Sequence, residues 1–274
     1  MNEFTVLLTG SNGFLGKSLK IYLNSKNVKI ETVSIRTKHD IDKLIDKVNA
    51  SKNNYKIINA GWSGVINGSL NKDTQYVNFE LQKYFFQISH SPNVIKFINF
   101  GSYNEYGDIE GMLTEDLINL KPISEYAVVK NMLRHYIEDS YHWKNFLHIR
   151  IANVYGPNQP TNSLYGTLLN FSNNPLYFGA GNALRDMLHI DDFCNAIYLI
   201  LYSNLNGILN LGSGESITNK KFIILLSNLL KIPLNQLYFD QKKRDNIFMS
   251  ENFTLSIEKA KSILDWNPSF VLKY

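Results

Sequence analysis

Cysteine is nearly absent from this chain, since Cys194 is the single one among 274 residues. One cysteine cannot build a disulfide framework or a cysteine-based metal site, and this scarcity is typical of a reducing compartment. His189 precedes Asp191 and Asp192, but no third side chain follows at metal-ligand spacing. We interpret these three residues as cap structure at the start of a helix, and we expect no metal ion.

Long hydrophobic runs are also lacking. No stretch reaches the roughly 18 apolar residues that a transmembrane helix needs. The first residues, MNEFTVLL, lack the cationic start and the cleavage site of an export signal. We therefore expect a cytoplasmic protein without a membrane partner.

A strong excess of either charge is missing too. The chain has 28 Lys and Arg residues against 24 Asp and Glu, spread without a dense basic block, for a formal net charge of +4. This mild excess suits a phosphorylated small molecule better than nucleic acid, so no nucleic-acid partner is expected. With 44% hydrophobic residues, the chain can bury one sizeable core.

Short β-rich runs alternate with amphipathic segments through the first two thirds of the chain. This alternation predicts an α/β protein with a doubly wound parallel sheet of the Rossmann type. The expected strands are residues 4–8, 29–35, 56–59, 95–100 and 147–151, and the expected helices between them are residues 16–25, 41–50, 73–89 and 124–141.

A glycine-rich turn joins the first expected strand to the first expected helix. Its sequence, TGSNGFLG over residues 9–16, has G-x-x-G-x-x-G spacing, which differs from the G-x-G-x-x-G form. Glycines let backbone N–H groups approach a pyrophosphate, and the helix N-terminus adds partial positive charge. The turn therefore predicts binding of a nicotinamide dinucleotide. The expected contacts are Gly10, Ser11, Asn12, Gly13, Phe14, Leu15 and Gly16, with Ala60 after the strand at residues 56–59.

The second expected strand ends without the acidic residue that would hydrogen-bond a ribose 2′-hydroxyl. Arg36 and Lys38 stand there instead, and such side chains pair with a 2′-phosphate. NADPH is thus favoured as the cofactor. NAD stays open as the alternative, because charges at a strand end are also typical of a solvated surface.

The rhythm of the sequence changes after Gly156 and Pro157. Asn and Ser accumulate over residues 158–174, and three later helices are expected, interrupting shorter strands. These helices are residues 191–203, 219–230 and 257–264, and the strands are residues 208–211 and 236–239. We expect residues 1–157 to form mainly the NAD(P)-binding domain, and residues 158–274 mainly a smaller, interleaved C-terminal substrate-binding lobe.

Tyr126 and Lys130 are four residues apart, on one face of the helix expected at residues 124–141. A lysine cation beside a tyrosine favours the phenolate and brings the phenol pKa, about 10 in water, toward the working range of a general acid or base. Ser102 follows the strand at residues 95–100, at the carboxyl edge of the sheet. There it can hydrogen-bond the same substrate oxygen that Tyr126 protonates.

These motifs, in this order, resemble the extended short-chain dehydrogenase/reductase family over nearly the whole chain. They are Gly10, Gly13, Gly16, Ser102, Tyr126 and Lys130, followed by NVYGP at residues 153–157, RDMLHIDD at residues 185–192 and NLGSG at residues 210–214. Members of that family act on nucleotide-activated sugars. The resemblance implies that Ser102, Tyr126 and Lys130 form a catalytic triad, with Lys130 also reaching the nicotinamide ribose.

The same resemblance implies substrate contacts and an assembly. Asn153 and Arg185 fall where the family contacts the sugar diphosphate, and an arginine suits such an oxyanion by charge and geometry. Tyr177 and Phe178 are candidates for the wall around the nucleoside base, or for core packing. Relatives pair the long helices expected at residues 73–89 and 124–141 between subunits, which implies a homodimer.

Departures from the family's subgroups narrow the reaction. Its dehydratases carry an Asp-Glu pair directly after the catalytic Ser or Thr, where this chain has Tyr103 and Asn104. The epimerase-reductase that makes GDP-fucose uses a Cys and a His where this chain has Asn104 and Asn158, and neither amide can shuttle protons.

The resemblance then implies NADPH-dependent reduction of the C4 ketone of a nucleotide-activated 4-keto-6-deoxyhexose, in deoxysugar biosynthesis. The chief alternative is a nucleotide-sugar 4-epimerase, which uses the same residues with tightly bound NAD. A second alternative, from a different class, is a non-catalytic NADP-binding regulator.

Overall fold

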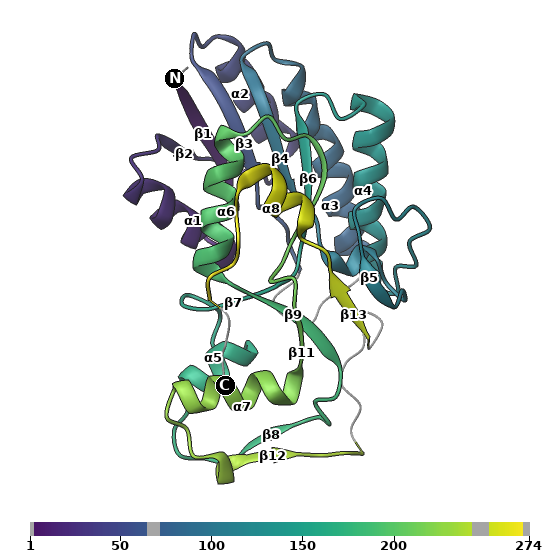
Figure 1. Ribbon diagram of the computed structural model, residues 1–274. Helices are drawn as coiled ribbons and strands as arrows, with labels where there is room; N and C mark the ends of the chain where they lie inside the picture. The colour runs from purple at the N-terminus through teal and green to yellow at the C-terminus, as the bar shows by residue number, and fades with distance from the viewer. Residues whose placement is uncertain (1–2, 65–71, 243–251, 271–274) are drawn as a thin grey trace.

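The computed structural model describes residues 3–64, 72–242 and 252–270. Its largest element is a sheet of six strands, namely β1 Phe4–Thr9, β2 Ile30–Thr32, β3 Asn54–Asn59, β4 Val94–Phe100, β6 Phe146–Ile151 and β10 Gly207–Leu211. They lie in the order β10-β6-β4-β3-β1-β2, and every neighbouring pair is parallel (Figure 1). The predicted parallel sheet of the Rossmann type is confirmed.

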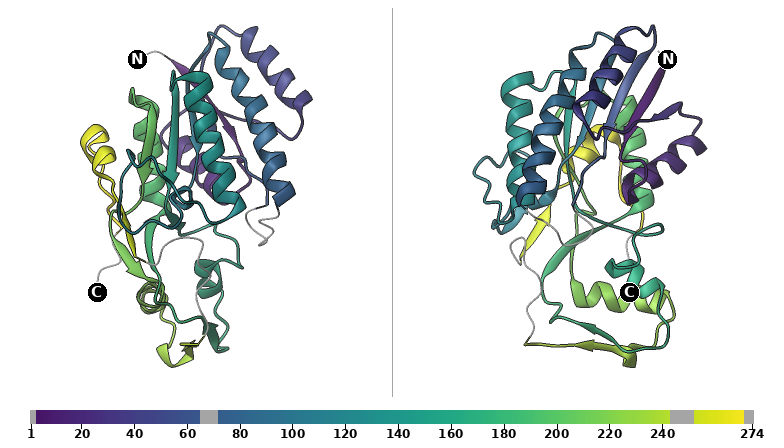
Figure 2. Two further views of the ribbon diagram at one scale, coloured as in Figure 1. Left: turned by 90° about the vertical axis from the view of Figure 1, so that its right-hand side faces the viewer. Right: turned by 180° about the vertical axis from the view of Figure 1, so that it is seen from behind.

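Helices cover both faces of this sheet (Figures 1 and 2). One face carries α1 Phe14–Ser25, α6 Ile190–Tyr202 and α8 Glu258–Leu264, and the other carries α2 Lys38–Asn49, α3 Lys72–Phe86 and α4 Glu125–Tyr141. Because both faces are buried, the strands are apolar almost throughout. Short 3-10 turns stand at η1 Gln87–His90, η2 Tyr103–Glu105 and η3 Leu234–Gln236.

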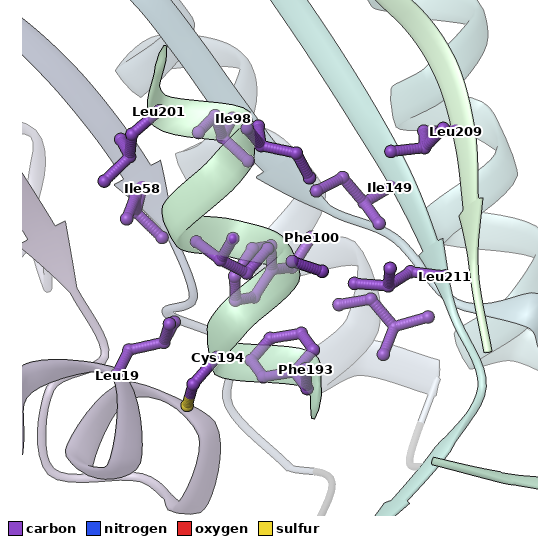
Figure 3. Packing of buried hydrophobic residues seen from close by; sticks show 14 of the residues in the cluster. Leu19, Ile58, Ile98, Phe100, Ile149, Phe193, Cys194, Leu201, Leu209 and Leu211 are labelled. Carbon is purple, nitrogen blue, oxygen red and sulfur yellow. The ribbon is translucent and has the colours of Figure 1, made fainter. Parts of the chain in front are cut away.

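Alternate residues along a strand of the main sheet pack into two separate hydrophobic cores, one on each face of the sheet. Val6 and Leu8 of β1 join the cluster under α1 and α6, whereas Leu7 joins the cluster under α2, α3 and α4. In the first cluster, Leu19 of α1 and Phe193 of α6 pack over the sheet (Figure 3). The period of two along a strand explains this division.

The order of the strands places a ligand crevice. β1 lies between β2 and β3. The chain passes from β1 to β2 on one side and then crosses back to β3 on the other side of β1. Parallel sheets bind ligands at such a switch point, outside the carboxyl ends of the strands. The glycine turn follows β1, and Ala60 follows β3, so both lie at this point.

A second group of elements lies beyond the carboxyl edge of the main sheet (Figure 1). It contains a three-stranded sheet in the order β11-β9-β7, a parallel strand pair β8–β12, and two helices packed around Phe222. These elements are β7 Asn153–Tyr155, α5 Leu164–Leu169, β8 Leu176–Phe178, β9 Leu184–His189, β11 Ser216–Thr218, α7 Asn219–Leu229 and β12 Leu237–Phe239. The chain returns to the main sheet between them, through α6 and β10.

Some elements differ from expectation. β2 is shorter than residues 29–35, because this edge strand pairs only with β1. The Asn- and Ser-rich residues 158–174 contain α5, which begins at a Ser163 cap. The strands β5 Gly111–Leu113 and β13 Phe253–Leu255 pair in parallel although they are far apart in the chain. No helix in the described ranges is long and apolar enough to cross a membrane.

Candidate active site

A cavity of about 650 Å³ lies at the carboxyl edge of the main sheet. The main sheet and its helices contribute Gly10, Gly13, Phe14, Leu15, Gly16, Ala60, Trp62, Ser102, Tyr103, Asn104, Tyr126 and Lys130 to its wall. The second group of elements contributes Asn153, Gln159, Tyr165, Arg185, Met187 and Phe222, among others. The structure thus brings most of the predicted site residues to one cavity.

The glycine turn leaves no room for side chains. Gly10 has a φ of +65°, and a Cβ built there would lie 2.5 Å from the carbonyl oxygen of Ala60. A Cβ on Gly16 would lie 2.2 Å from the carbonyl oxygen of Gly10. Both positions therefore require glycine, as expected for a turn that packs against the next strand and admits a ligand closely.

The N-terminus of α1 differs from that of five other helices, although α8 also lacks a side-chain cap. α1 begins at Gly13 without a side-chain cap and has no acidic residue in its first turn. By contrast, α2, α4, α5, α6 and α7 each begin at a side chain that accepts a backbone hydrogen bond. The first N–H groups of α1 thus lack a capping side chain, which fits a pyrophosphate in the predicted place.

Ser102, Tyr126 and Lys130 converge on the other side of the cavity. Ser102 follows β4 and begins η2, while Tyr126 and Lys130 lie in the first two turns of α4. The Ser102 side chain lies near enough to the Tyr126 hydroxyl to influence its pKa. Lys130 Nζ donates to the carbonyl oxygen of Phe100 at 2.7 Å and lies 3.6 Å from the centroid of the Trp62 ring.

Burial dominates the protonation of these side chains. It lowers the pKa of Lys130 from 10.5 to about 7, against the opposing charge of Glu105. It raises the pKa of Tyr126, against the opposing hydrogen bond from Ser102. The sequence predicts a lowered pKa for Tyr126, and the structure shows a rise because desolvation disfavours the phenolate more strongly. Tyr126 is therefore protonated at neutral pH and suited to donate a proton.

Asn153 and Arg185 line the cavity on the side of β7 and β9. Asn153 Nδ2 donates to the Tyr103 hydroxyl at 2.6 Å. Arg185 is only 8% exposed, and its Nη1 donates to the carbonyl oxygen of Leu184 at 2.5 Å. A guanidinium has five N–H donors, so Arg185 can keep this bond and still bind a ligand oxyanion.

Four predicted cofactor contacts do not line the cavity. Ser11 and Asn12 belong to the glycine turn but are absent from the cavity wall, and Arg36 and Lys38 are exposed beyond β2. Lys38 Nζ lies 5.1 Å from the centroid of the Tyr84 ring. None of these four residues is part of the cavity wall.

Tyr177 also lies outside the cavity. It stands on β8 with 76% of its surface exposed, and its ring stacks on Tyr238 of β12 with centroids 5.2 Å apart. The neighbouring Phe178 packs in the core around Phe222 and stacks on Phe239. Neither Tyr177 nor Phe178 is part of the cavity wall, so the predicted contact of Tyr177 with the substrate is not formed there.

The sequence reasoning missed a buried cluster of charged and polar side chains next to Ser102. Glu105, His148 and Arg150 have no exposed surface, and they contact one another. Two features of the sequence could have indicated this cluster. Ser102 and Glu105 have the S-x-x-E spacing of a capping box, which the structure forms, and two polar residues stand in the buried strand β6.

The fold and the site together define a Rossmann-type enzyme of the extended short-chain dehydrogenase/reductase kind. The chain belongs to the NAD dependent epimerase/dehydratase family, whose sequence model matches residues 6–212. Members of this family are NAD(P)-dependent oxidoreductases and epimerases of nucleotide sugars.

Individual relatives are distant. The chain is 26% identical to the dTDP-4-dehydro-6-deoxyglucose reductase of Escherichia coli, over 97% of this chain and 93% of that protein. It is 24% identical to the GDP-L-colitose synthase of Yersinia pseudotuberculosis, over 82% of each. Among solved structures, the UDP-glucose 4-epimerase of Thermotoga maritima with UDP-glucose matches with a TM-score of 0.82 at 20% identity, over 98% of this chain and 95% of that one.

Proposed function

We propose that this enzyme reduces the C4 ketone of a nucleotide-activated 4-keto-6-deoxyhexose, with NADPH as its cofactor. The observation that carries the proposal is the convergence of Ser102, Tyr126 and Lys130 with the glycine turn in one cavity. Reduction of a carbonyl needs one proton donor and polarising groups, but no further acid or base at a sugar carbon. The E. coli reductase among the relatives supports this choice of reaction.

Each of the three side chains has a task in such a reduction. Tyr126 gives its proton to the carbonyl oxygen, and Ser102 hydrogen-bonds the same oxygen and orients the ketone. Lys130, anchored on the carbonyl oxygen of Phe100, places positive charge beside the phenolate that forms and reaches the nicotinamide ribose. Bound NADPH supplies the hydride.

Cofactor contacts are proposed along the glycine turn. The backbone of residues 10–16 and the N-terminus of α1 would hold the pyrophosphate, with Ala60 at the neighbouring strand end. Arg36 and Lys38 would pair with the 2′-phosphate, because they follow β2, the strand beside β1. Asn153 and Arg185 would hold the sugar diphosphate from the opposite side of the cavity.

Dehydration fits the site less well. Tyr103 and Asn104 line the cavity at the two positions after Ser102, and neither carries a carboxylate. Glu105, the next residue, is fully buried and hydrogen-bonded to His148, outside the cavity wall. An elimination would need an acid and a base in contact with the sugar, and these three positions do not supply them.

A nucleotide-sugar 4-epimerase with tightly bound NAD is the second candidate. The same three side chains serve it, and a solved 4-epimerase has the same fold. A non-catalytic NADP-binding regulator needs the glycine turn, but it has no need of the triad together with Asn153 and Arg185. We therefore favour catalysis.

The proposal extends to the domain division, the compartment, the pathway and the oligomeric state of the enzyme. Residues 1–157 would form mainly the cofactor domain and residues 158–274 mainly the substrate lobe, in a cytoplasmic enzyme of deoxysugar biosynthesis. A homodimer through α3 and α4 is proposed from the resemblance to relatives that pair these two helices between subunits.

A substrate panel tests the reaction. Purified protein is incubated with NADPH and a set of nucleotide-linked 4-keto-6-deoxyhexoses, and the product is analysed by NMR. We expect stoichiometric oxidation of NADPH and a C4 alcohol of one configuration. Release of NAD on denaturation, with interconversion of C4 epimers and no net NADPH oxidation, would instead establish the epimerase.

A further inference from the structure

A buried hydrogen-bond chain crosses the carboxyl ends of β1, β3, β4 and β6. The Gly61 N–H donates to Thr9 Oγ1 at 2.9 Å, and the Thr9 hydroxyl donates to Asn59 Oδ1 at 2.9 Å. Asn59 Nδ2 then donates to Asn99 Oδ1 at 2.8 Å and to Gln82 Oε1 at 2.6 Å. All four of these side chains, on Thr9, Asn59, Gln82 and Asn99, are at most 4% exposed.

Backbone groups of Gly61 fix the direction of this chain. The Thr9 hydroxyl oxygen accepts from the Gly61 N–H, so the hydroxyl proton is free to point to Asn59. The Gly61 carbonyl oxygen accepts from Gln82 Nε2 at 3.0 Å, which turns Gln82 Oε1 toward Asn59 Nδ2. The amide of Asn59 therefore has one orientation that satisfies all its partners.

The same direction assigns the proton on His148. With Asn99 Oδ1 accepting from Asn59, Asn99 Nδ2 faces His148 Nδ1 at 3.0 Å and must donate to it. The proton of the neutral imidazole then resides on Nε2, which lies 3.0 Å from Glu105 Oε1. Burial lowers the pKa of His148, which agrees with a neutral ring.

Glu105 connects the end of this chain to the catalytic wall. Its Oε1 accepts from the Ser102 N–H at 2.8 Å, and its Oε2 lies 3.3 Å from Arg150 Nε. Burial alone would raise the pKa of Glu105, but the hydrogen bonds from His148 and Ser102 and the charge of Arg150 lower it below its usual range. The carboxylate is therefore ionised at every pH at which the enzyme would work.

We propose that Glu105 is a positioning residue, whose carboxylate fixes the Ser102 turn beside Lys130, with His148 holding that carboxylate as its Nε2–H tautomer. The inference rests on the proposed catalytic roles of Ser102 and Lys130. It explains why an ion pair is buried beside a site whose chemistry needs no carboxylate at the substrate.

The charge of Glu105 acts in one direction on both catalytic groups. It raises the pKa of Lys130 and that of Tyr126, because a nearby anion favours the protonated form of each. Removing it should lower both values, so the direction of the shift is the same for reduction and for epimerisation. The other titratable groups that influence this cluster include Tyr103, Tyr106, Arg134, His148 and Arg150.

Glu105→Gln tests the charge while keeping the shape of the side chain. The matched control is Glu110→Gln, which removes the same charge from an exposed position on the same loop. We expect Glu105→Gln to move the alkaline limb of the pH profile of kcat to lower pH by about half a unit or more, and to lower kcat about tenfold or less, with the dinucleotide Kd unchanged within about twofold. The control should leave the profile in place.

An alkaline limb in Glu105→Gln that coincides with the wild-type limb overturns the proposal, and so does an equal shift in Glu110→Gln. If Glu105→Gln fails to fold because Arg150 is left unpaired, the double variant Glu105→Gln with Arg150→Met removes both charges. It should show a smaller shift in the same direction, because losing the Arg150 cation acts in the opposite sense. An unshifted limb in the folded double variant likewise overturns the proposal.

A second measurement needs no substrate. The chain has six histidines, and the 15N signals of His148 can be assigned by their loss in His148→Gln. We expect a protonated Nε2 and an unprotonated Nδ1 from pH 6 to pH 8. A His148 that titrates in this range, or that carries its proton on Nδ1, overturns the proposed role of Glu105, whereas failure of the whole substrate panel overturns only the proposed reaction.

Discussion

The two walls of the cavity are built on different principles. The proposed cofactor wall is one continuous segment, residues 9–16, in which backbone atoms would bind the dinucleotide and side chains are excluded from Gly10 and Gly16. The catalytic wall is made of side chains that come from η2 and α4, and beneath it lies a hydrogen-bond chain that crosses four strands. A substitution in the first wall changes the space for a ligand, and one in the second changes proton affinity or orientation.

This difference predicts separable defects. A change in the glycine turn should abolish dinucleotide binding, and catalysis with it. A change in the catalytic wall should spare binding and remove turnover. The comparison fails if variants of both walls lose the same property.

The largest effect is expected for Gly10→Ala. The new Cβ would lie 2.5 Å from the Ala60 carbonyl oxygen, at a φ of +65° that alanine adopts poorly. We expect loss of measurable dinucleotide binding, or destabilisation by about 3 kcal/mol or more, followed by calorimetry and denaturant unfolding.

Gly207→Ala is the matched control for this variant. Gly207 has a φ of +83°, but a Cβ there has no atom within 4 Å. Gly207→Ala should lower the free energy of unfolding by only about 1–2 kcal/mol and leave dinucleotide affinity unchanged. Equal behaviour of the two alanine variants would show that backbone strain, and not close approach to Ala60, explains the defect.

A smaller effect is expected for Arg36→Ala at the rim of the cofactor wall. The side chain is exposed beyond β2, so its proposed pairing with a 2′-phosphate is screened by solvent. We expect the KM for NADPH to rise about tenfold, because one charged hydrogen-bond donor is lost. The KM for NADH is the internal control and should stay unchanged. An equal rise for both cofactors would assign Arg36 a structural role and return the choice of cofactor to NAD.

The cofactor wall could be predicted from the sequence because its signal is local. The glycine spacing stands between one strand and one helix, so no distant residue is needed to interpret it. Ser102, Tyr126 and Lys130 were also predictable, because a strand end and one helix turn place them. Their protonation was not, since desolvation dominates the pKa of Tyr126 and depends on the whole cavity.

Features that depend on strand pairing could not be predicted in this way. The contact of Glu105 with His148 requires the relation of η2 to β6, and the orientation of Asn99 requires β3 and β4 side by side. The parallel pairing of β5 with β13 joins distant segments with no local signal. Tyr177 lies outside the cavity because β8 pairs with β12, and nothing in its own segment indicates that partner.

The most direct test of the account is the turnover of Tyr126→Phe with NADPH and a nucleotide-linked 4-keto-6-deoxyhexose that the wild-type enzyme reduces. Phenylalanine keeps the ring against Trp62, whose centroid is 6.1 Å away, and removes the proton donor. We expect kcat to fall by about 10²–10⁴-fold while the Kd for NADPH stays within about twofold. Wild-type turnover in Tyr126→Phe would contradict the central claim that this phenol donates the proton.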